Sequence, residues 1–402
     1  MKLGCIADDY TGATDLAGLL ARSGVRVQLH FGLPAADVPS SAEIEIIALK
    51  CRSIAVDAAV ESCLQAGRWL RARGASTLYW KYCSTFDSTA SGNIGPVAEA
   101  LLELTGQRQA LYCPAFPENG RSVFMGHLFV GDQLLSESSL KDHPLNPMTD
   151  ANLCRVLAPQ VTAPVGLWSR LDQRAGKAMP DARHVIADAV EFSDLEYLIA
   201  HTPESVLLTG GSALAMPLPA HLGLVGDQSD PLPQVGTRSL ILSGSCSSMT
   251  QQQVAYWRAH HPAFQIDPLR PESVQEALNW WHSQSAETPC LIYATDTPDA
   301  VRASQAALGV QEAGHRIEQA MGAIAKAATA AGVRRLVVAG GETSGAVTQA
   351  LAVHQVRVGQ EICPGVPWIY AGVSDPIALA LKSGNFGGPE FFQEAFNVLG
   401  DA

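Results

Sequence analysis

The chain has 402 residues, enough for two or three domains, and 47% hydrophobic residues against 16% charged residues exclude a disordered chain. Its 27 Lys and Arg against 39 Asp and Glu give a net charge of −12, which argues against a nucleic-acid partner because such a partner requires a basic face. No apolar run approaches the ~20 residues that span a bilayer, so we expect no membrane partner.

Short apolar strands alternate with helical stretches through the first half of the chain. Predicted strands lie at 3–7, 25–31, 44–49, 77–82, 110–113, 165–167, 184–187 and 206–208. Predicted helices lie at 14–23, 56–73 and 97–104. This alternation is typical of parallel sheets flanked by helices. The segment 116–150 differs, because it is rich in Gly, Pro, Ser and Asn and has little helical period, and a segment of this kind is more often functional than idle.

The second half resumes the same alternation after a segment rich in Gly and Pro at 222–237. Predicted strands lie at 239–242, 290–294 and 336–339, and predicted helices at 250–260, 304–331 and 346–351. We therefore predict an N-terminal domain at 1–225, a linker at 226–236 and a C-terminal domain at 237–402. The expected fold is a two-domain α/β protein in which each largely parallel or mixed sheet is flanked by helices, with the active site in the interdomain cleft.

The nine cysteines include no C-x-x-C pair, and most lie in apolar stretches. The apolar run at the N-terminus turns acidic at Asp8, so we expect no signal peptide. These features indicate a cytoplasmic protein with buried thiols and no structural zinc. An oligomer is compatible with the sequence, which does not define one.

Two strand-to-helix corners in the second half, at 243–248 and 340–345, are rich in small and hydroxyl residues, and a glycine-rich turn follows at 382–388. A helix N-terminus directs N–H groups and the positive end of its dipole at one point, which suits phosphate, and glycine permits close approach. The alternative is that any α/β fold needs glycines at such turns. Neither the P-loop pattern nor a clean G-x-G-x-x-G is present. Glu342 either complements the helix dipole or holds Mg²⁺.

Asp8 and Asp9 follow the first strand, where a parallel sheet presents its ligands. One of the two carboxylates is expected to cap the following helix and the other to face a ligand. We expect Asp8 to be the helix-side residue and Asp9 to face the ligand. Capping alone is the alternative interpretation.

A dense polar cluster at 81–95 follows another strand and offers an ammonium, hydroxyls, a carboxylate and an amide, which suits a small anionic polyol. The alternative is a polar turn before a helix. Arg121 is a candidate for a bidentate carboxylate clamp, although a lone Arg is more often part of a surface ion pair. The predicted substrate-binding residues are Asp8, Thr11, Lys81, Ser84, Ser88, Asn93 and Arg121.

Five stretches together resemble the four-carbon acid sugar kinase family along essentially the whole chain. They are 7–15, 81–95, 113–121, 142–148 and 340–345. The resemblance implies an N-terminal domain that binds the sugar acid, a C-terminal domain that binds ATP, and a 4-phosphorylated four-carbon acid as product. The string from Lys81 to Thr89 is similar to that of the family members that act on 3-oxo-tetronate, of the 3-dehydro-erythronate type. A kinase for threonate or erythronate is the alternative within the family.

The resulting prediction is an ATP-dependent kinase that phosphorylates the terminal (C4) hydroxyl of this acid, with Mg²⁺ offsetting the phosphate charge. Asp9 is the first choice for the catalytic carboxylate and Asp87 the second, and Lys81 and Arg121 are assigned to the substrate carboxylate. The predicted ATP-binding residues are Ser243, Ser245, Gly341, Glu342, Thr343, Ser344 and Gly384, with Glu342 also the metal ligand. A sugar-acid sensor without catalysis is the alternative from another class, and an oxidoreductase is disfavoured because the dinucleotide fingerprint is missing.

Overall fold

A computed structural model describes residues 1–35, 38, 42–142, 146–224, 226 and 232–399 of the chain. The chain divides into two compact units, Met1–Gln228 and Ser229–Ala402. Residues 227–231 of the predicted linker at 226–236 lie outside the described residues, as do positions 143–145 of the stretch at 142–148. No helix within the described residues combines the length and apolar character needed to span a bilayer.

Unit 1 is built on a parallel sheet in the order β2-β3-β1-β4-β11-β5-β10-β9. Its strands are β1 (Leu3–Ala7), β2 (Val27–Phe31), β3 (Ile44–Ala48), β4 (Thr77–Lys81), β5 (Gln109–Cys113), β9 (Val165–Trp168), β10 (His184–Ala187) and β11 (Val206–Gly210). Most of these strands are buried along their whole length, as expected for continuous apolar runs covered on both faces. The parallel order confirms the sheet predicted for the first half.

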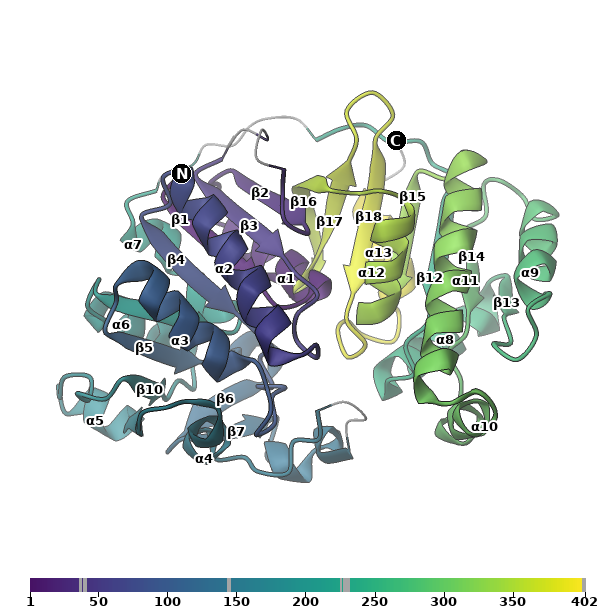
Figure 1. Ribbon diagram of the computed structural model, residues 1–402. Coiled ribbons are helices and arrows are strands. Elements are labelled where there is room, and N and C mark those ends of the chain that lie inside the picture. The colour runs from purple at the N-terminus through teal and green to yellow at the C-terminus, as the bar shows by residue number, and fades with distance from the viewer. Residues whose placement is uncertain (36–37, 39–41, 143–145, 225, 227–231, 400–402) are drawn as a thin grey trace. The chain divides into compact units, whose positions relative to one another are not determined.

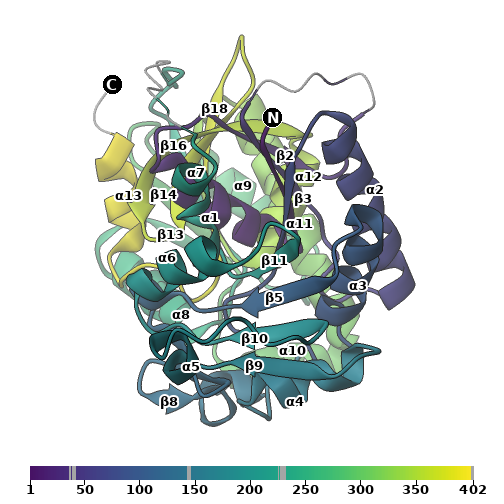
Figure 2. The same ribbon diagram turned by 90° about the vertical axis from the view of Figure 1, so that its left-hand side faces the viewer.

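Helices cover both faces of this sheet. They are α1 (Tyr10–Ala21), α2 (Val56–Ala72), α3 (Ile94–Thr105), α4 (Leu153–Leu157), α5 (Arg170–Arg174), α6 (Phe192–His201) and α7 (Leu218–His221). In Figures 1 and 2, α2 and α3 lie together on one face, and α1, α6 and α7 lie on the other. The buried positions of α2 include Ala59, Cys63, Ala66 and Leu70, whose spacing of three to four residues forms the apolar stripe that faces the sheet.

Within the segment 116–150, residues 121–134 form a small antiparallel sheet of β6 (Arg121–Phe124), β7 (His127–Val130) and β8 (Gln133–Leu134). Asp188 fixes the β6–β7 turn, because its carboxylate accepts hydrogen bonds from the N–H groups of Met125 at 2.7 Å and Gly126 at 2.9 Å. Asp188, which follows β10, therefore holds this small sheet against the parallel sheet of unit 1, and Arg121 lies at the start of β6.

Unit 2 contains a mixed sheet in the order β13-β14-β12-β15-β18-β17-β16. Its strands are β12 (Ser239–Ser243), β13 (Ala263–Gln265), β14 (Cys290–Tyr293), β15 (Arg335–Ala339), β16 (Gln355–Cys363), β17 (Val366–Ala371) and β18 (Ile377–Lys382). β13, β14, β12, β15 and β18 are parallel, whereas β17 runs antiparallel to both β18 and β16. The two units together confirm the predicted two-domain α/β fold.

The helices of unit 2 are α8 (Ser248–His260), α9 (Ser273–His282), α10 (Pro298–Leu308), α11 (Val310–Ala330), α12 (Gly341–Ala350) and α13 (Phe391–Leu399). A core of large aromatic side chains joins α8 and α13 to one face of the sheet, with Trp257, Trp368, Phe391 and Phe392 all buried. The single helix predicted at 304–331 is wrong. The helix is interrupted at Gly309, whose φ of 86° does not fit an α-helix, so α10 and α11 are separate helices.

Candidate active site

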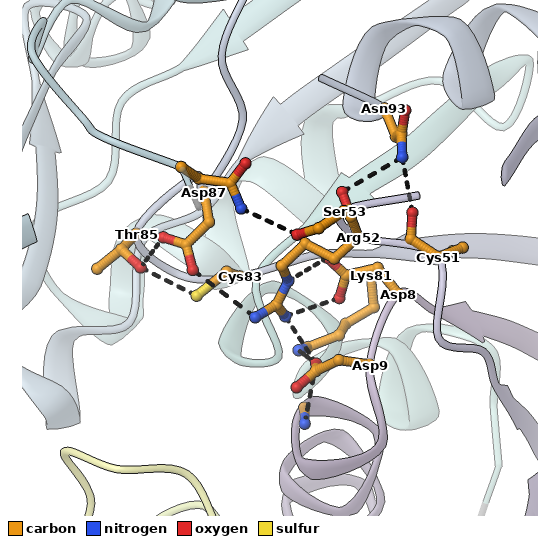
Figure 3. Close-up of polar contacts among 12 residues, drawn as sticks. Asp8, Asp9, Cys51, Arg52, Ser53, Lys81, Cys83, Thr85, Asp87 and Asn93 are labelled. Carbon is orange, nitrogen blue, oxygen red and sulfur yellow. Dashed lines mark hydrogen bonds and ion pairs between the residues drawn. The ribbon is translucent and has the colours of Figure 1, made fainter. Parts of the chain in front are cut away.

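Three neighbouring strands of unit 1 end beside one another and bring distant polar residues together. β3, β1 and β4 are parallel, with Ala7 in register with both Ala48 and Lys81. Strand order reverses at β1, since β2 and β3 lie on one side and β4 on the other, and open sheets bind ligands at such a reversal. The Arg52 cluster gathers at this edge and consists of Asp8, Asp9, Arg52, Lys81 and Asp87 (Figure 3).

Arg52 lies at the centre of the cluster. Its Nε donates to Oδ2 of Asp8 at 2.7 Å, and its Nη2 donates to Oδ1 of Asp8 at 2.9 Å. The same Nη2 donates to Oδ1 of Asp9 at 2.7 Å, and Nη1 lies 3.6 Å from Oδ2 of Asp87. A guanidinium with several fixed donors is suited to hold carboxylates of different strands in one arrangement. Arg52 was not among the predicted site residues.

Asp9, rather than Asp8, caps α1, which corrects the predicted roles of the two residues. Oδ1 of Asp9 accepts a hydrogen bond from the N–H of Gly12 at 3.1 Å, and Oδ2 accepts one from the Thr11 hydroxyl at 2.7 Å. Asp8 is 3% exposed and faces Arg52 instead. Either carboxylate was a candidate for the cap of α1 from the sequence alone. The cap is the residue whose side chain accepts from the N–H three positions further on, and for Asp9 this is the N–H of Gly12.

The two carboxylates differ in pKa. Burial raises the pKa of Asp8 above its ordinary value, against the opposing charge of Arg52. Burial acts in the same direction on Asp9, but Arg52, Lys81 and the hydrogen bonds from Thr11 and Gly12 outweigh it and hold the pKa of Asp9 well below its usual range. Asp9 is thus an ionised hydrogen-bond acceptor whose basicity is weak.

Lys81 completes the cluster from β4. It is 3% exposed, and its Nζ lies 3.6 Å from Oδ1 of Asp9. A Cβ on Gly12 would overlap both Nζ of Lys81 and Oδ1 of Asp9, so this position requires glycine for the close approach of the helix. The buried ammonium therefore sits against the first turn of α1.

The chain after β4 makes a tight polar turn that presents Asp87. The Thr85 hydroxyl donates to Oδ1 of Asp87 at 2.6 Å and lies 2.9 Å from the thiol of Cys83. Phe86 is fully buried and has a positive φ of 53°, an uncommon backbone conformation for a bulky residue. Packing of this ring holds the turn in the form that directs Asp87 toward Arg52.

Two other predicted residues of this stretch make structural contacts. The Asn93 amide nitrogen lies 2.7 Å from the carbonyl of Cys51 and 3.0 Å from that of Ile54, so it fixes the loop that carries Arg52. The Ser88 hydroxyl donates to Oε1 of Gln160 at 3.1 Å and is 2% exposed. Ser84, by contrast, is partly exposed. Substrate contact by Asn93, Ser88 and Ser84 remains a prediction.

Arg121 stands at the start of β6 with most of its side chain buried. One of its terminal nitrogens donates to the carbonyl of Asn119, and its Nε has no hydrogen-bond partner among the described residues. Burial lowers the pKa of Arg121, whereas Cys83, Asp15 and Asp87 raise it. Arg121 therefore lies within electrostatic reach of Asp87, which belongs to the Arg52 cluster. A buried donor without a partner is costly, so a ligand that accepts from it would bind with advantage.

Unit 2 assembles the three glycine-containing turns at the carboxyl ends of β12, β15 and β18, which are adjacent in the sheet. The N–H of Gly244 donates to the carbonyl of Ala339 at 3.0 Å, and the N–H of Gly340 donates to that of Lys382 at 2.8 Å. A Cβ on Gly384 would lie 2.8 Å from the hydroxyl oxygens of both Ser245 and Ser247. We call these turns the phosphate corner, comprising residues 244–247, 340–344 and 382–384.

Lys382 has a buried amino group in this corner, and the sequence did not single it out as a site residue. Its Nζ donates to the carbonyls of Ser383 and Gly384, both at 2.9 Å, and to the hydroxyl of Thr250 at 3.2 Å. The Ser247 hydroxyl donates to the carbonyl of Gly384 at 2.6 Å. Burial lowers the pKa of Lys382 to about 7. The buried Lys382 side chain holds the glycine turn through these hydrogen bonds and does not project into solvent.

The remaining predicted nucleotide residues occupy different environments. Gly341, Glu342 and Thr343 form the first turn of α12, whose N–H groups have no partner within the helix. The Ser344 hydroxyl is buried and unpaired in the part of the chain that the structure describes. The Ser243 hydroxyl is fully buried at 2.7 Å from that of Thr295 and so contributes to the core. Glu342 is exposed, and no group of three His, Cys, Asp or Glu suited to a metal occurs within the described ranges.

These features define a class of two-domain proteins. One α/β unit carries a polar cluster that is suited to bind a polyol, and the other carries glycine-containing turns that are suited to bind phosphate. Family models agree, since a sugar-binding N-terminal domain matches residues 3–218 and a nucleotide-binding C-terminal domain matches residues 240–392. The chain belongs to the four-carbon acid sugar kinase family.

Curated relatives match along almost their whole length. The chain is 48% identical to a 3-oxo-tetronate kinase of Pseudomonas fluorescens, with 99% of this chain and 97% of the relative covered. It is 49% identical to a protein of the same name from Cupriavidus necator, again over 99% and 97%.

Solved structures share the fold. A Salmonella typhimurium LT2 protein, described provisionally as a tRNA synthase, is 39% identical and has a TM-score of 0.84, with 98% of both chains covered. Protein HI1011 of Haemophilus influenzae is also 39% identical and has a TM-score of 0.75, with 98% of this chain and 99% of that chain covered.

Proposed function

We propose that this protein is an ATP-dependent kinase that transfers a phosphoryl group to the terminal C4 hydroxyl of 3-oxo-tetronate. The observation that carries the proposal is 48–49% identity, over 99% of the chain, to proteins named 3-oxo-tetronate kinase. The two clusters support it independently, since one offers cations and carboxylates for a hydroxy acid and the other offers N–H groups for phosphate.

Lys81 and Arg121 are assigned to the substrate carboxylate. Both are buried for most of their length, and the Nε of Arg121 has no hydrogen-bond partner among the described residues. A guanidinium can bind a carboxylate through two parallel N–H donors. Arg52 has a different role, because its Nε and Nη2 already bind Asp8 and Asp9 and hold the acidic side chains in place.

The hydroxyl that attacks ATP has to be oriented and has to lose its proton, and Asp9 and Asp87 are the candidates. The low pKa of Asp9, caused by Arg52 and Lys81, makes it a weak proton acceptor. Asp87 accepts a hydrogen bond from the Thr85 hydroxyl and makes a longer ion pair with Arg52 at 3.6 Å. We therefore assign proton acceptance to Asp87 and hydroxyl orientation to Asp9, which reverses the order expected from the sequence.

The phosphate corner fits the triphosphate of ATP. A Cβ on Gly244, Gly340 or Gly384 would come within 3 Å of a neighbouring hydroxyl oxygen, so these positions require glycine. Glycine lets the backbone approach phosphate oxygens closely, and the first turn of α12 directs N–H groups at the same place. Mg²⁺, which commonly binds through phosphate oxygens and few carboxylates, would offset the charge that develops on the transferred group. Glu342, exposed in the first turn of α12, is the carboxylate assigned to it.

Direct transfer requires the C4 hydroxyl and the terminal phosphate of ATP to meet in line. Since the acid and ATP are assigned to different domains, the reaction requires them to be brought together with water excluded, because water competes as the phosphoryl acceptor.

The test is ATP consumption by the purified full chain with 3-oxo-tetronate, threonate and erythronate as separate acceptors. The proposal predicts the highest kcat/KM with 3-oxo-tetronate. Faster turnover of threonate or erythronate would replace the substrate within the same reaction. Tight binding of an acid without ATP consumption would instead identify a sensor.

A further inference from the structure

A cavity of about 390 Å³ lies within unit 2, between the loop that follows β13 and the long helix α11. Its size is within the range of small-molecule sites, about 300–1,000 Å³. Ile266, Pro268, Val274, Ile317 and Ala320 supply its apolar lining, and Asp267 lies among them. The phosphate corner as described above does not account for this cavity.

Ile317 lies next to both the cavity and the phosphate corner. A Cβ on Gly244 would lie 3.2 Å from Cγ2 of Ile317, so this side chain borders the phosphate corner and lines the cavity as well. β13 and β12 are both parallel to the intervening β14, so Asp267 and Gly244 follow strands that end at the same edge of the sheet. A nucleotide with its phosphates in the corner would therefore extend toward this cavity.

The two arginines that line the cavity are both paired with carboxylates, which suits an uncharged ligand portion. Arg270 binds Glu272 at 3.0 Å and Glu276 at 2.7 Å, and the Nε of Arg316 binds Glu312 at 2.9 Å. These cations are thus engaged with acidic neighbours and make a poor second anion site. A base and ribose are uncharged and largely apolar on their flat faces, so they match the lining better than another phosphate does.

Asp267 supplies the specific polar contact. It stands two residues after the end of β13, and its Oδ1 accepts a hydrogen bond from the N–H of Leu269 at 2.8 Å, which orients the carboxylate. A carboxylate has about four acceptor positions, so capacity remains for hydroxyl donors. A pair of ribose hydroxyls is the donor arrangement that a carboxylate at the end of a parallel strand is suited to bind.

We propose that this cavity takes the base and ribose of the nucleotide, with Ile317 against the nucleoside and Asp267 accepting from the ribose hydroxyls. The inference rests on the proposed function, since it extends the site assigned to ATP. It makes Asp267 the residue that distinguishes a ribonucleotide from its deoxy analogues.

The test measures binding of ATP, 2′-deoxy-ATP, 3′-deoxy-ATP and inorganic tripolyphosphate to the full chain by calorimetry. Two variants perturb the cavity, Asp267→Asn and Ala320→Trp, the second filling it from α11. Two matched controls, Asp299→Asn and Ala303→Trp, make the same changes at exposed positions of α10 outside the cavity.

Asp267→Asn is expected to weaken ATP binding about tenfold or more, the size of a lost hydrogen bond to a charged group. Ala320→Trp is expected to weaken ATP binding because the indole occupies the cavity, and both variants are expected to leave tripolyphosphate binding unchanged. Asp267→Asn is also expected to reduce the preference for ATP over the deoxy analogues. Unchanged ATP affinity in both variants would overturn the inference while leaving the phosphate corner intact. Failure of the unaltered chain to bind either ATP or tripolyphosphate would overturn the proposed function together with the inference.

Discussion

Removal of the Arg52 side chain is expected to destabilise unit 1 strongly, because it leaves a buried carboxylate without its partner. Asp8 is 4% exposed and Arg52 is 23% exposed in their side chains, and two hydrogen bonds of 2.7 and 2.9 Å join them. Loss of one member of such a pair costs about 3–5 kcal/mol. For a unit of the size of Met1–Gln228, 1 kcal/mol corresponds to about 2–4 °C, so Arg52→Met should melt roughly 6–20 °C lower.

The assay is thermal unfolding of Arg52→Met, Asp8→Asn and the double variant. A second Asp8→Asn change should recover part of the loss, since it removes the uncompensated charge. The loss should also shrink as the pH falls, because protonation of Asp8, whose pKa would rise further without Arg52, neutralises the buried carboxylate.

Arg155 provides a matched control, since it binds Asp150 through Nε at 2.7 Å and Nη2 at 2.6 Å on the surface of the same unit, with 63% of its side chain exposed. Arg155→Met should have a far smaller effect, because solvent screens exposed pairs. Equal melting temperatures of Arg52→Met and Arg155→Met would refute the reasoning.

Four further predictions address the two sites. Arg121→Ala should raise the KM for the acid about 10- to 150-fold in steady-state assays, as expected for loss of one charge-assisted contact, and Arg121→Lys should also raise it. An unchanged KM in Arg121→Ala would remove this residue from the site. Asp87→Asn should lower kcat roughly 10²- to 10⁴-fold with little change in KM, and more than Asp9→Asn does; the opposite order would return the proton acceptor to Asp9. Gly341→Val should raise the KM for ATP and leave acid binding unchanged, whereas loss of acid binding with ATP binding intact would reverse the domain assignment. Burial lowers the pKa of Lys382 to about 7 in the folded chain, so between this pH and the ordinary lysine pKa only the unfolded chain keeps the proton on this amine, and the free energy of unfolding rises with pH in that range. Lys382→Met should flatten that part of the profile of melting temperature against pH, and an unchanged profile would contradict the assignment.

The sequence predicts the strands and the glycine-containing turns of unit 2 well, because both depend on local features. Continuous apolar runs define buried strands whatever their partners, and small residues between a strand and a helix define a close turn. The predicted helix at 304–331 failed for a local reason as well. Gly309 lies between two helical patterns, and a single glycine can be tolerated within a helix. Only the backbone conformation therefore shows that the helix is interrupted at this residue.

Arg52 could not be identified from spacing, since it is 44 residues from Asp8 in the sequence and reaches it only because β3 and β1 are adjacent. The only local signal is its position shortly after a predicted strand. The roles of Asp8 and Asp9 were ambiguous for a different reason, because adjacent carboxylates fit the same capping pattern until side-chain directions are known. Sheet order and side-chain direction are therefore what the structure adds to the sequence.

Identification of the reaction product shows whether the protein phosphorylates 3-oxo-tetronate at C4. The full chain is incubated with ATP, Mg²⁺ and 3-oxo-tetronate, and the product is examined by mass spectrometry and by correlation of ³¹P with ¹H in NMR. A C4 kinase yields one added phosphoryl group whose phosphorus couples to the protons on C4. Phosphate on another position, or ADP formed together with free phosphate and unmodified acid, would contradict phosphorylation at C4.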